Sequence, residues 1–212
     1  MEFQPLKYVY IASGIPNAIT LLLFHGTGGD ENDLLAIGKN LGEDFNILSV
    51  RGNVLEHGMP RFFRRIAAGI FDEEDLKFRT HELVHFLKSV SRTENFNLEN
   101  LIAVGYSNGA NIAGSIVMLY PNFLSGAILF RPMMPYKNIP SFKSIKKTPI
   151  LIISGDFDTM VPLLEIELYK DVLTTNNFIV TLNHLKAGHN LVTTDISLAK
   201  KWLIESYMNR FK

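Results

Sequence analysis

The stretch Leu101–Tyr120, LIAVGYSNGANIAGSIVMLY, decides the fold that we expect for this chain. Its first four residues form an apolar run of strand type, and the segment after Asn108 is rich in small residues and helix formers. Between them, Ser107 stands at the centre of a Gly-x-Ser-x-Gly pentapeptide. Strand, sharp turn and helix are the context of a nucleophile elbow, which lifts the serine hydroxyl above the edge of a sheet. This context favours the elbow over a plain strand-to-helix loop.

The glycines that flank the serine have a steric reason. In so tight a turn the backbones of strand and helix come close together, and a side chain at Gly105 or Gly109 would collide with them. Small residues continue along the helix at Ala110, Ala113 and Gly114, which suits a helix pressed against a sheet.

Further apolar runs of strand length lie on both sides of the elbow and alternate with helical patterns. The expected strands are 8–12 (an outer strand), 19–24, 46–50, 124–130, 149–154 and 178–185, and the expected helices include 73–90, 163–173 and 195–208. Asp30 to Asp33 are expected to cap another helix, with Leu34, Leu35, Ile37 and Leu41 as its apolar face. This alternation predicts one α/β domain over residues 1–212, with a mostly parallel central sheet and helices on both faces.

Residues 51–71 form a long connection without a clean period, and long irregular loops tend to carry function. A packed surface excursion is the alternative. We expect five apolar side chains of this loop and of the segment after strand 124–130 to line a substrate pocket, namely Phe62, Phe63, Phe71, Met133 and Met134.

Composition excludes several classes of function. The 21 basic residues balance the 21 acidic ones, which argues against nucleic acid or an anionic membrane surface as a partner. The basic clusters, Arg61 with Arg64 and Arg65, and Lys143 with Lys146 and Lys147, are expected to be solvated faces or local ion pairs. The chain has no cysteine, so disulfides, thiolate metal sites and a cysteine nucleophile are excluded. Neither a signal peptide nor a bilayer-spanning run is visible, which predicts a cytoplasmic protein without membrane insertion.

A serine nucleophile needs a base to take its proton and an acid to orient that base. In α/β hydrolases these partners follow the serine in the order acid, histidine, on loops after later strands. The loop after strand 149–154 offers Asp156 and Asp158; we favour Asp158, because Asp156 is so close to the strand end that it is expected to brace the loop. The loop after strand 178–185 offers His189, whereas His184 lies within that strand and is expected to be structural. The other histidines precede Ser107 and do not fit the order; they are His25, which is expected to shape a glycine loop, His57, His81 and His85.

The developing oxyanion needs preorganised N–H donors, one from the residue after the nucleophile and one from the loop after an early strand. The first is then the backbone of Asn108, and the second is expected from Thr27 in the glycine loop His25-Gly26-Thr27-Gly28-Gly29. A phosphate cradle is the other use of such glycines, but no Lys-Ser/Thr pair follows them.

Together, LLLFHGTGGDENDLL, SVRG, HGMPRFFRR with FDEEDL, GYSNGANIA, SGDFDTMVP and AGH resemble the phospholipase/carboxylesterase family of α/β hydrolases. Within it they are most similar to small bacterial carboxylesterases of the MhqD type, relatives of acyl-protein thioesterases. The resemblance implies an α/β-hydrolase fold with a minimal lid, Ser107, Asp158 and His189 as a catalytic triad, Thr27 and Asn108 as oxyanion donors, and no metal or organic cofactor. Thr27 and Asn108 stand where the thioesterase relatives usually have Leu and Gln, so their substrates are not carried over.

The sequence therefore predicts a serine carboxylesterase that acts on small to medium apolar acyl or aryl esters. A thioesterase or lysophospholipase would use the same residues, and a noncatalytic ligand-binding module with a hydrolase fold is the alternative from another class. The expected partner is a small-molecule ester, and a homodimer formed through an exposed apolar edge or loop is compatible with the sequence.

Overall fold

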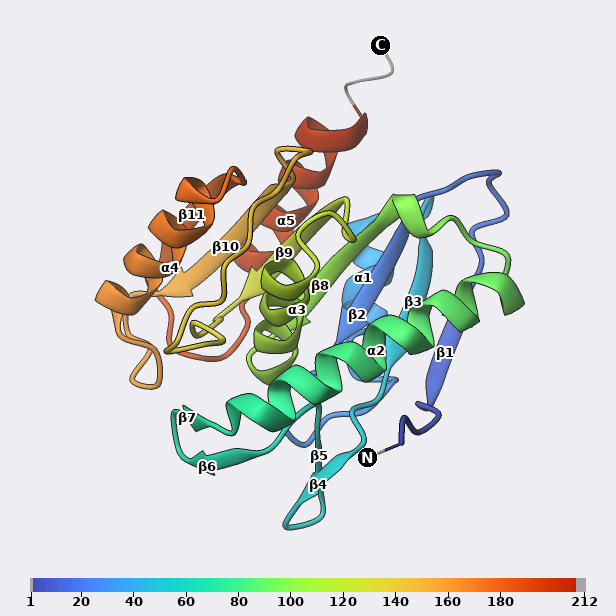
Figure 1. The fold of residues 1–212 in the computed structure, drawn as a ribbon. Helices are drawn as coiled ribbons and strands as arrows, with labels where there is room; N and C mark the ends of the chain where they lie inside the picture. Colours follow the sequence, from blue (N-terminus) through green and yellow to red (C-terminus); the bar gives the residue numbers. More distant parts are fainter. Residues whose placement is uncertain (1, 209–212) are drawn as a thin grey trace.

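The computed structural model describes residues 2–208 and has a seven-stranded sheet at its centre (Figure 1). The spatial order of the strands is β1-β3-β2-β8-β9-β10-β11. β1 (Tyr8–Ile11) is antiparallel to β3 (Asn46–Val50). The other pairs are parallel and join β2 (Thr20–Phe24), β8 (Leu101–Tyr106), β9 (Gly126–Phe130), β10 (Pro149–Gly155) and β11 (Ile179–Leu185). The mostly parallel sheet predicted from the sequence is confirmed.

Helices cover both faces of this sheet, as predicted. They are α1 (Leu35–Leu41), α2 (Glu73–Thr93), α3 (Asn108–Leu119), α4 (Leu163–Thr175) and α5 (Thr193–Leu203), with a 3₁₀ turn η1 (Leu98–Asn100) and a π turn η2 (Ile204–Met208). Two hydrophobic cores result, one beneath α2, α3 and α4 and the other beneath α1 and α5. Successive side chains of β2 point to opposite faces of the sheet, so Leu22 belongs to the first core and Leu23 to the second. None of the helices within residues 2–208 is both long and apolar enough to cross a membrane.

The segment 51–71 is more regular than its sequence predicted. It folds into two small antiparallel hairpins, β4 (Val54–Glu56) with β5 (Met59–Arg61), and β6 (Arg65–Ala67) with β7 (Ile70–Phe71). Strands of two or three residues are too short to display an alternating pattern, so no pattern in the sequence predicts them. Their turns need residues at positive φ, found at His57, Gly58 and Gly69.

The predicted cap of the first helix is wrong. α1 begins at Leu35, and the residue before it makes no side-chain hydrogen bond to the helix. Asp30 instead accepts a hydrogen bond from the N–H of Asn32 and pairs with Arg51 at 3.0 Å. Asp30 therefore connects the loop after β2 to Arg51 in the loop after β3.

Candidate active site

Ser107 lies in a strained turn between β8 and α3. Its φ of 52° and ψ of −114° are unusual for a residue with a side chain, and such strain persists where surrounding structure enforces it. The Ser107 N–H donates to the carbonyl of Phe130 on β9 at 2.9 Å, and the Ser107 carbonyl accepts from the N–H of Asn111 at 3.0 Å. A Cβ atom at Gly105 would lie 2.5 Å from the carbonyl oxygen of Gly109. The pentapeptide thus has the geometry of an elbow.

The structure brings Ser107, His189 and Asp158 together at the carboxyl ends of parallel strands. His189 Nε2 lies 2.8 Å from Ser107 Oγ, and His189 Nδ1 lies 2.7 Å from Asp158 Oδ2. The Asp158 side chain is fully buried, and its other oxygen accepts from the N–H of Met160 at 2.8 Å. With Nδ1–H donating to this carboxylate, Nε2 is the acceptor for the serine hydroxyl. The three groups therefore form a continuous hydrogen-bonded chain.

The competing candidates lie elsewhere. Asp156 lies 3.9 Å from His184 Nδ1, and His184 Nε2 lies 3.1 Å from Glu167. The contact between His184 and Glu167 connects β11 to α4. His25 is buried: its Nδ1 donates to the Gly26 carbonyl at 2.6 Å and its Nε2 accepts from the N–H of Gly52 at 3.1 Å. Burial lowers the pKa of His25, which keeps the ring neutral within the glycine loop.

The two predicted oxyanion residues lie at the ends of neighbouring elements. Thr27 follows β2 in a turn closed by the Gly29 N–H on the Gly26 carbonyl at 3.1 Å. Asn108 is the first residue of α3, where a backbone N–H has no partner in a preceding helical turn. Its buried side chain accepts a hydrogen bond from the N–H of Phe62 at 2.8 Å. The segment between the two hairpins therefore supports the peptide that follows Ser107.

The cluster of Arg61, Arg64 and Arg65 makes local ion pairs, one of the two outcomes expected for it, but Arg61 is not on a solvated face, since its side chain is only 4% exposed. The guanidinium donates from Nη1 to the hydroxyl of Thr27 at 2.8 Å and from Nε to the carbonyl of Phe63 at 3.2 Å. Glu56 lies 3.5 Å from it. Burial lowers the pKa of Arg61, although the side chain stays charged at neutral pH. The sequence showed only a run of arginines here and no signal for this contact.

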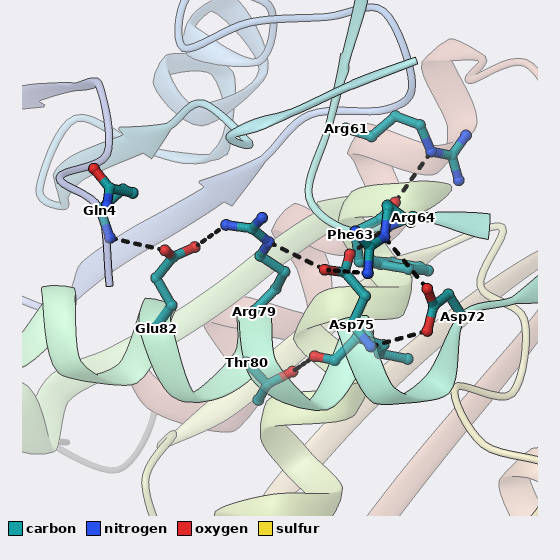
Figure 2. A network of polar contacts seen from close by, with 10 residues as sticks. Gln4, Arg61, Phe63, Arg64, Asp72, Asp75, Arg79, Thr80 and Glu82 are labelled. Atoms are coloured by element: carbon teal, nitrogen blue, oxygen red, sulfur yellow. Dashed lines mark hydrogen bonds and ion pairs between the residues drawn. The ribbon is translucent and has the colours of Figure 1, made fainter. Parts of the chain in front are cut away.

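A polar network fastens the same segment to α2 (Figure 2). The buried carboxylate of Asp75 accepts from the backbone N–H of Arg64 at 2.7 Å and lies 3.5 Å from Nε of Arg79. Arg79 donates to Glu82 at 2.8 Å, and Glu82 accepts from the N–H of Gln4 at 2.9 Å. The network fixes the chain immediately after Phe62 and Phe63, close to the support of Asn108.

The predicted pocket residues separate into two groups. Phe62 and Phe63 lie in the core, where the ring of Phe62 is 5.2 Å from that of Phe24 and the ring of Phe63 is 5.0 Å from that of Phe71. A cavity of about 320 Å³ is lined by the other three, Phe71, Met133 and Met134, together with Gly69, Glu73, Pro135, Tyr136, Lys137, Ile139, Glu165 and Leu168. In residues 2–208 no three His, Asp or Glu side chains gather as a metal-binding group.

Comparison with known proteins gives the family. The family model described as Phospholipase/Carboxylesterase matches residues 7–206 of this chain. The chain belongs to the phospholipase/carboxylesterase family. It is 40% identical over 201 residues to the Bacillus subtilis (strain 168) protein named "Putative hydrolase MhqD", covering 95% of this chain and 99% of that protein. The crystal structure of the Bacillus cereus carboxylesterase is 42% identical with a TM-score of 0.92, covering 95% of both chains.

One further protein similar to this chain has a name that denies it activity. An Oryza sativa subsp. japonica protein named "Probable inactive carboxylesterase" is 24% identical over 151 residues, covering 68% of this chain and 60% of that protein. Membership of the phospholipase/carboxylesterase family shows a relationship to hydrolases, and catalytic activity depends on the arrangement of groups around Ser107.

Proposed function

We propose that this chain is a serine carboxylesterase that hydrolyses small to medium apolar acyl or aryl esters. The observation that carries the proposal is the hydrogen-bonded chain from Ser107 Oγ to His189 and on to the buried carboxylate of Asp158, at 2.8 and 2.7 Å. A serine held in this way is activated, because its proton has a base to go to and the base is fixed in the required tautomer.

The reaction follows from these contacts. Ser107 Oγ attacks the ester carbonyl while His189 Nε2 takes its proton, and Asp158 stabilises the imidazolium that forms. His189 then returns the proton to the leaving alcohol or phenol as the tetrahedral intermediate collapses to an acyl-enzyme. A water molecule, deprotonated by the same nitrogen, attacks the acyl-enzyme and releases the acid and Ser107.

The oxyanion of each tetrahedral intermediate is assigned to the backbone N–H groups of Thr27 and Asn108. Support comes from their positions, since Thr27 follows β2 and Asn108 opens α3, where the helix dipole also favours negative charge. Fixed donors of this kind act without reorganising during the reaction, and removal of one typically costs about 10²- to 10³-fold in kcat.

The apolar side of the substrate is assigned to the cavity lined by Phe71, Met133 and Met134. Its volume of about 320 Å³ falls at the lower end of the range usual for small-molecule sites. The Met133 N–H donates to Asn111 Oδ1 at 2.8 Å, which ties the wall of the cavity to the first turn of α3. A small or medium acyl or aryl group fits this size and lining.

The experiment combines active-site labelling with a substrate series. Intact-mass analysis after treatment with a fluorophosphonate is expected to show one adduct on Ser107, and p-nitrophenyl esters from acetate to octanoate are expected to be hydrolysed. Ser107→Ala should fold normally and lose on the order of 10⁴-fold or more in kcat. Full activity in a pure Ser107→Ala preparation would refute the mechanism. Thioester and oxygen-ester pairs with the same acyl group separate a carboxylesterase from a thioesterase.

A further inference from the structure

A fully buried arginine lies behind the loop that carries His189. Arg131 directly follows β9, has a φ of 52° and exposes none of its side chain to solvent. Burial of a guanidinium is costly unless its charge is paired and its N–H groups are hydrogen-bonded. The catalytic steps above do not use Arg131, so its presence needs another reason.

Every N–H of this guanidinium has an acceptor. Nε donates to the carbonyl of Gly188 at 2.9 Å. Nη1 donates to the carbonyl of Ile153 at 3.3 Å and to Asp195 Oδ1 at 2.7 Å. Nη2 donates to the carbonyl of Asn190 at 3.2 Å and to Asp195 Oδ2 at 3.0 Å. An arginine has five N–H donors in a fixed planar fork, and all five are used here.

The acceptors hold the loop on both sides of His189. Gly188 and Asn190 are its two neighbours in the sequence, and both of their carbonyls point to the same guanidinium. The buried carboxylate of Asp195 neutralises the arginine and also accepts from the N–H of Val192 at 2.7 Å. The chain around His189 is thus fixed at three points by one ion pair.

The same short segment also holds the serine. Phe130 accepts the N–H of Ser107 through its carbonyl, and the next residue, Arg131, binds the loop of His189 through its side chain. The end of β9 therefore contacts both the turn that carries Ser107 and the loop that carries His189. Proton transfer depends on the distance of 2.8 Å between Ser107 Oγ and His189 Nε2.

We propose that Arg131, neutralised by Asp195, is a positioning residue that holds His189 at hydrogen-bond distance from Ser107. The proposal rests on the proposed function, because it takes His189 as the base. A lysine cannot replace the arginine, since its single ammonium has three donors and no planar fork for two carbonyls and a bidentate carboxylate.

The test separates positioning from folding. Arg131→Met alone leaves a buried, unpaired Asp195 and is expected to unfold or to fold poorly. The double variant Arg131→Met/Asp195→Leu removes both charges together, and such replacements are often neutral for stability. It should retain a cooperative urea transition, lose about 10²-fold in kcat and in the rate of fluorophosphonate labelling, and keep KM within about twofold, because the ester-binding cavity is untouched. Arg131→Lys should recover only a small part of the loss.

The matched control is Leu203→Ala, which removes a fully buried side chain from α5, the helix that carries Asp195, but leaves the ion pair in place. Its urea midpoint should fall below that of wild type, because a buried side chain is lost, while kcat of the folded protein stays within about twofold of wild type. A folded double variant with wild-type kcat would overturn the positioning role and leave the triad standing. If wild-type protein neither labels nor hydrolyses any ester, the proposed function fails first.

Discussion

Gly109 allows the sharpest test of the elbow, because the atoms that a side chain would meet there belong to the backbone. A Cβ atom at this position would lie 2.0 Å from the carbonyl oxygen of Phe24 and 2.6 Å from that of His25. Ordinary contacts of a Cβ begin at 3.4 Å, so Gly109→Ala requires a displacement of about 1.4 Å, the difference between 3.4 and 2.0 Å. Either α3 moves away from the sheet or the end of β2 moves.

Either displacement would move groups of the proposed active site. Moving the start of α3 shifts Ser107 and Asn108, and moving the end of β2 shifts the loop of Thr27. A misplacement of about 1 Å costs on the order of 10²-fold in rate, and overpacking costs about 1–3 kcal/mol of stability. We therefore expect Gly109→Ala to lose at least about 10²-fold in kcat for p-nitrophenyl acetate, with a urea midpoint lowered accordingly.

Gly114→Ala is the matched control, because it places the same side chain on the same helix. Its Cβ would meet side-chain atoms rather than backbone, namely the hydroxyl oxygen of the buried Tyr169 at 2.2 Å and Cγ of Pro135 at 3.0 Å. The hydroxyl has no hydrogen-bond partner among the described residues, so displacing it breaks no hydrogen bond. Gly114→Ala should lower stability by about 1–3 kcal/mol yet keep kcat within about threefold. The reasoning is refuted if Gly109→Ala, once folded, hydrolyses the ester as fast as Gly114→Ala does.

Two further predictions follow from buried polar groups near the site. Asn108→Leu removes the acceptor of the buried N–H of Phe62, so stability should fall by about 1–3 kcal/mol and kcat should fall with it; an unchanged urea midpoint would contradict this. For His25, burial lowers the folded-state pKa below its usual 6.5, so the unfolded chain binds more protons and stability declines as the pH falls from about 6.5 toward the folded-state value. Urea unfolding at about pH 7.5 and about pH 5.5 should show a smaller decline in His25→Gln than in wild type, and an equal decline would exclude His25 as its source.

The sequence alone determined the features that depend on neighbours a few residues apart. Apolar runs bounded by glycine and polar residues predicted the five inner strands of the central sheet, because a strand buried on both faces must be apolar along its whole length. The two edge strands, β1 and β11, were also expected, although they are only partly buried. The pentapeptide around Ser107 required a strand before it and a helix after it, and both were readable. Chain order then pointed to Asp158 and His189, which the fold brings together with Ser107; their catalytic roles stay predictions until Ser107→Ala is measured.

Only the tertiary structure decided which charged residues are buried and what they hold. Arg61 meets Thr27 across 34 positions, and Arg131 meets Asp195 across 64. No local pattern marks such contacts, since a buried arginine and a solvated one look alike in a sequence and differ in partners supplied by distant segments. Contacts between distant segments also place Phe62 and Phe63 in the core, where Phe62 packs against Phe24, rather than on the wall of the cavity. Local periodicity fixes the elements, whereas desolvation of charge is set by packing, which exists only once the chain has folded.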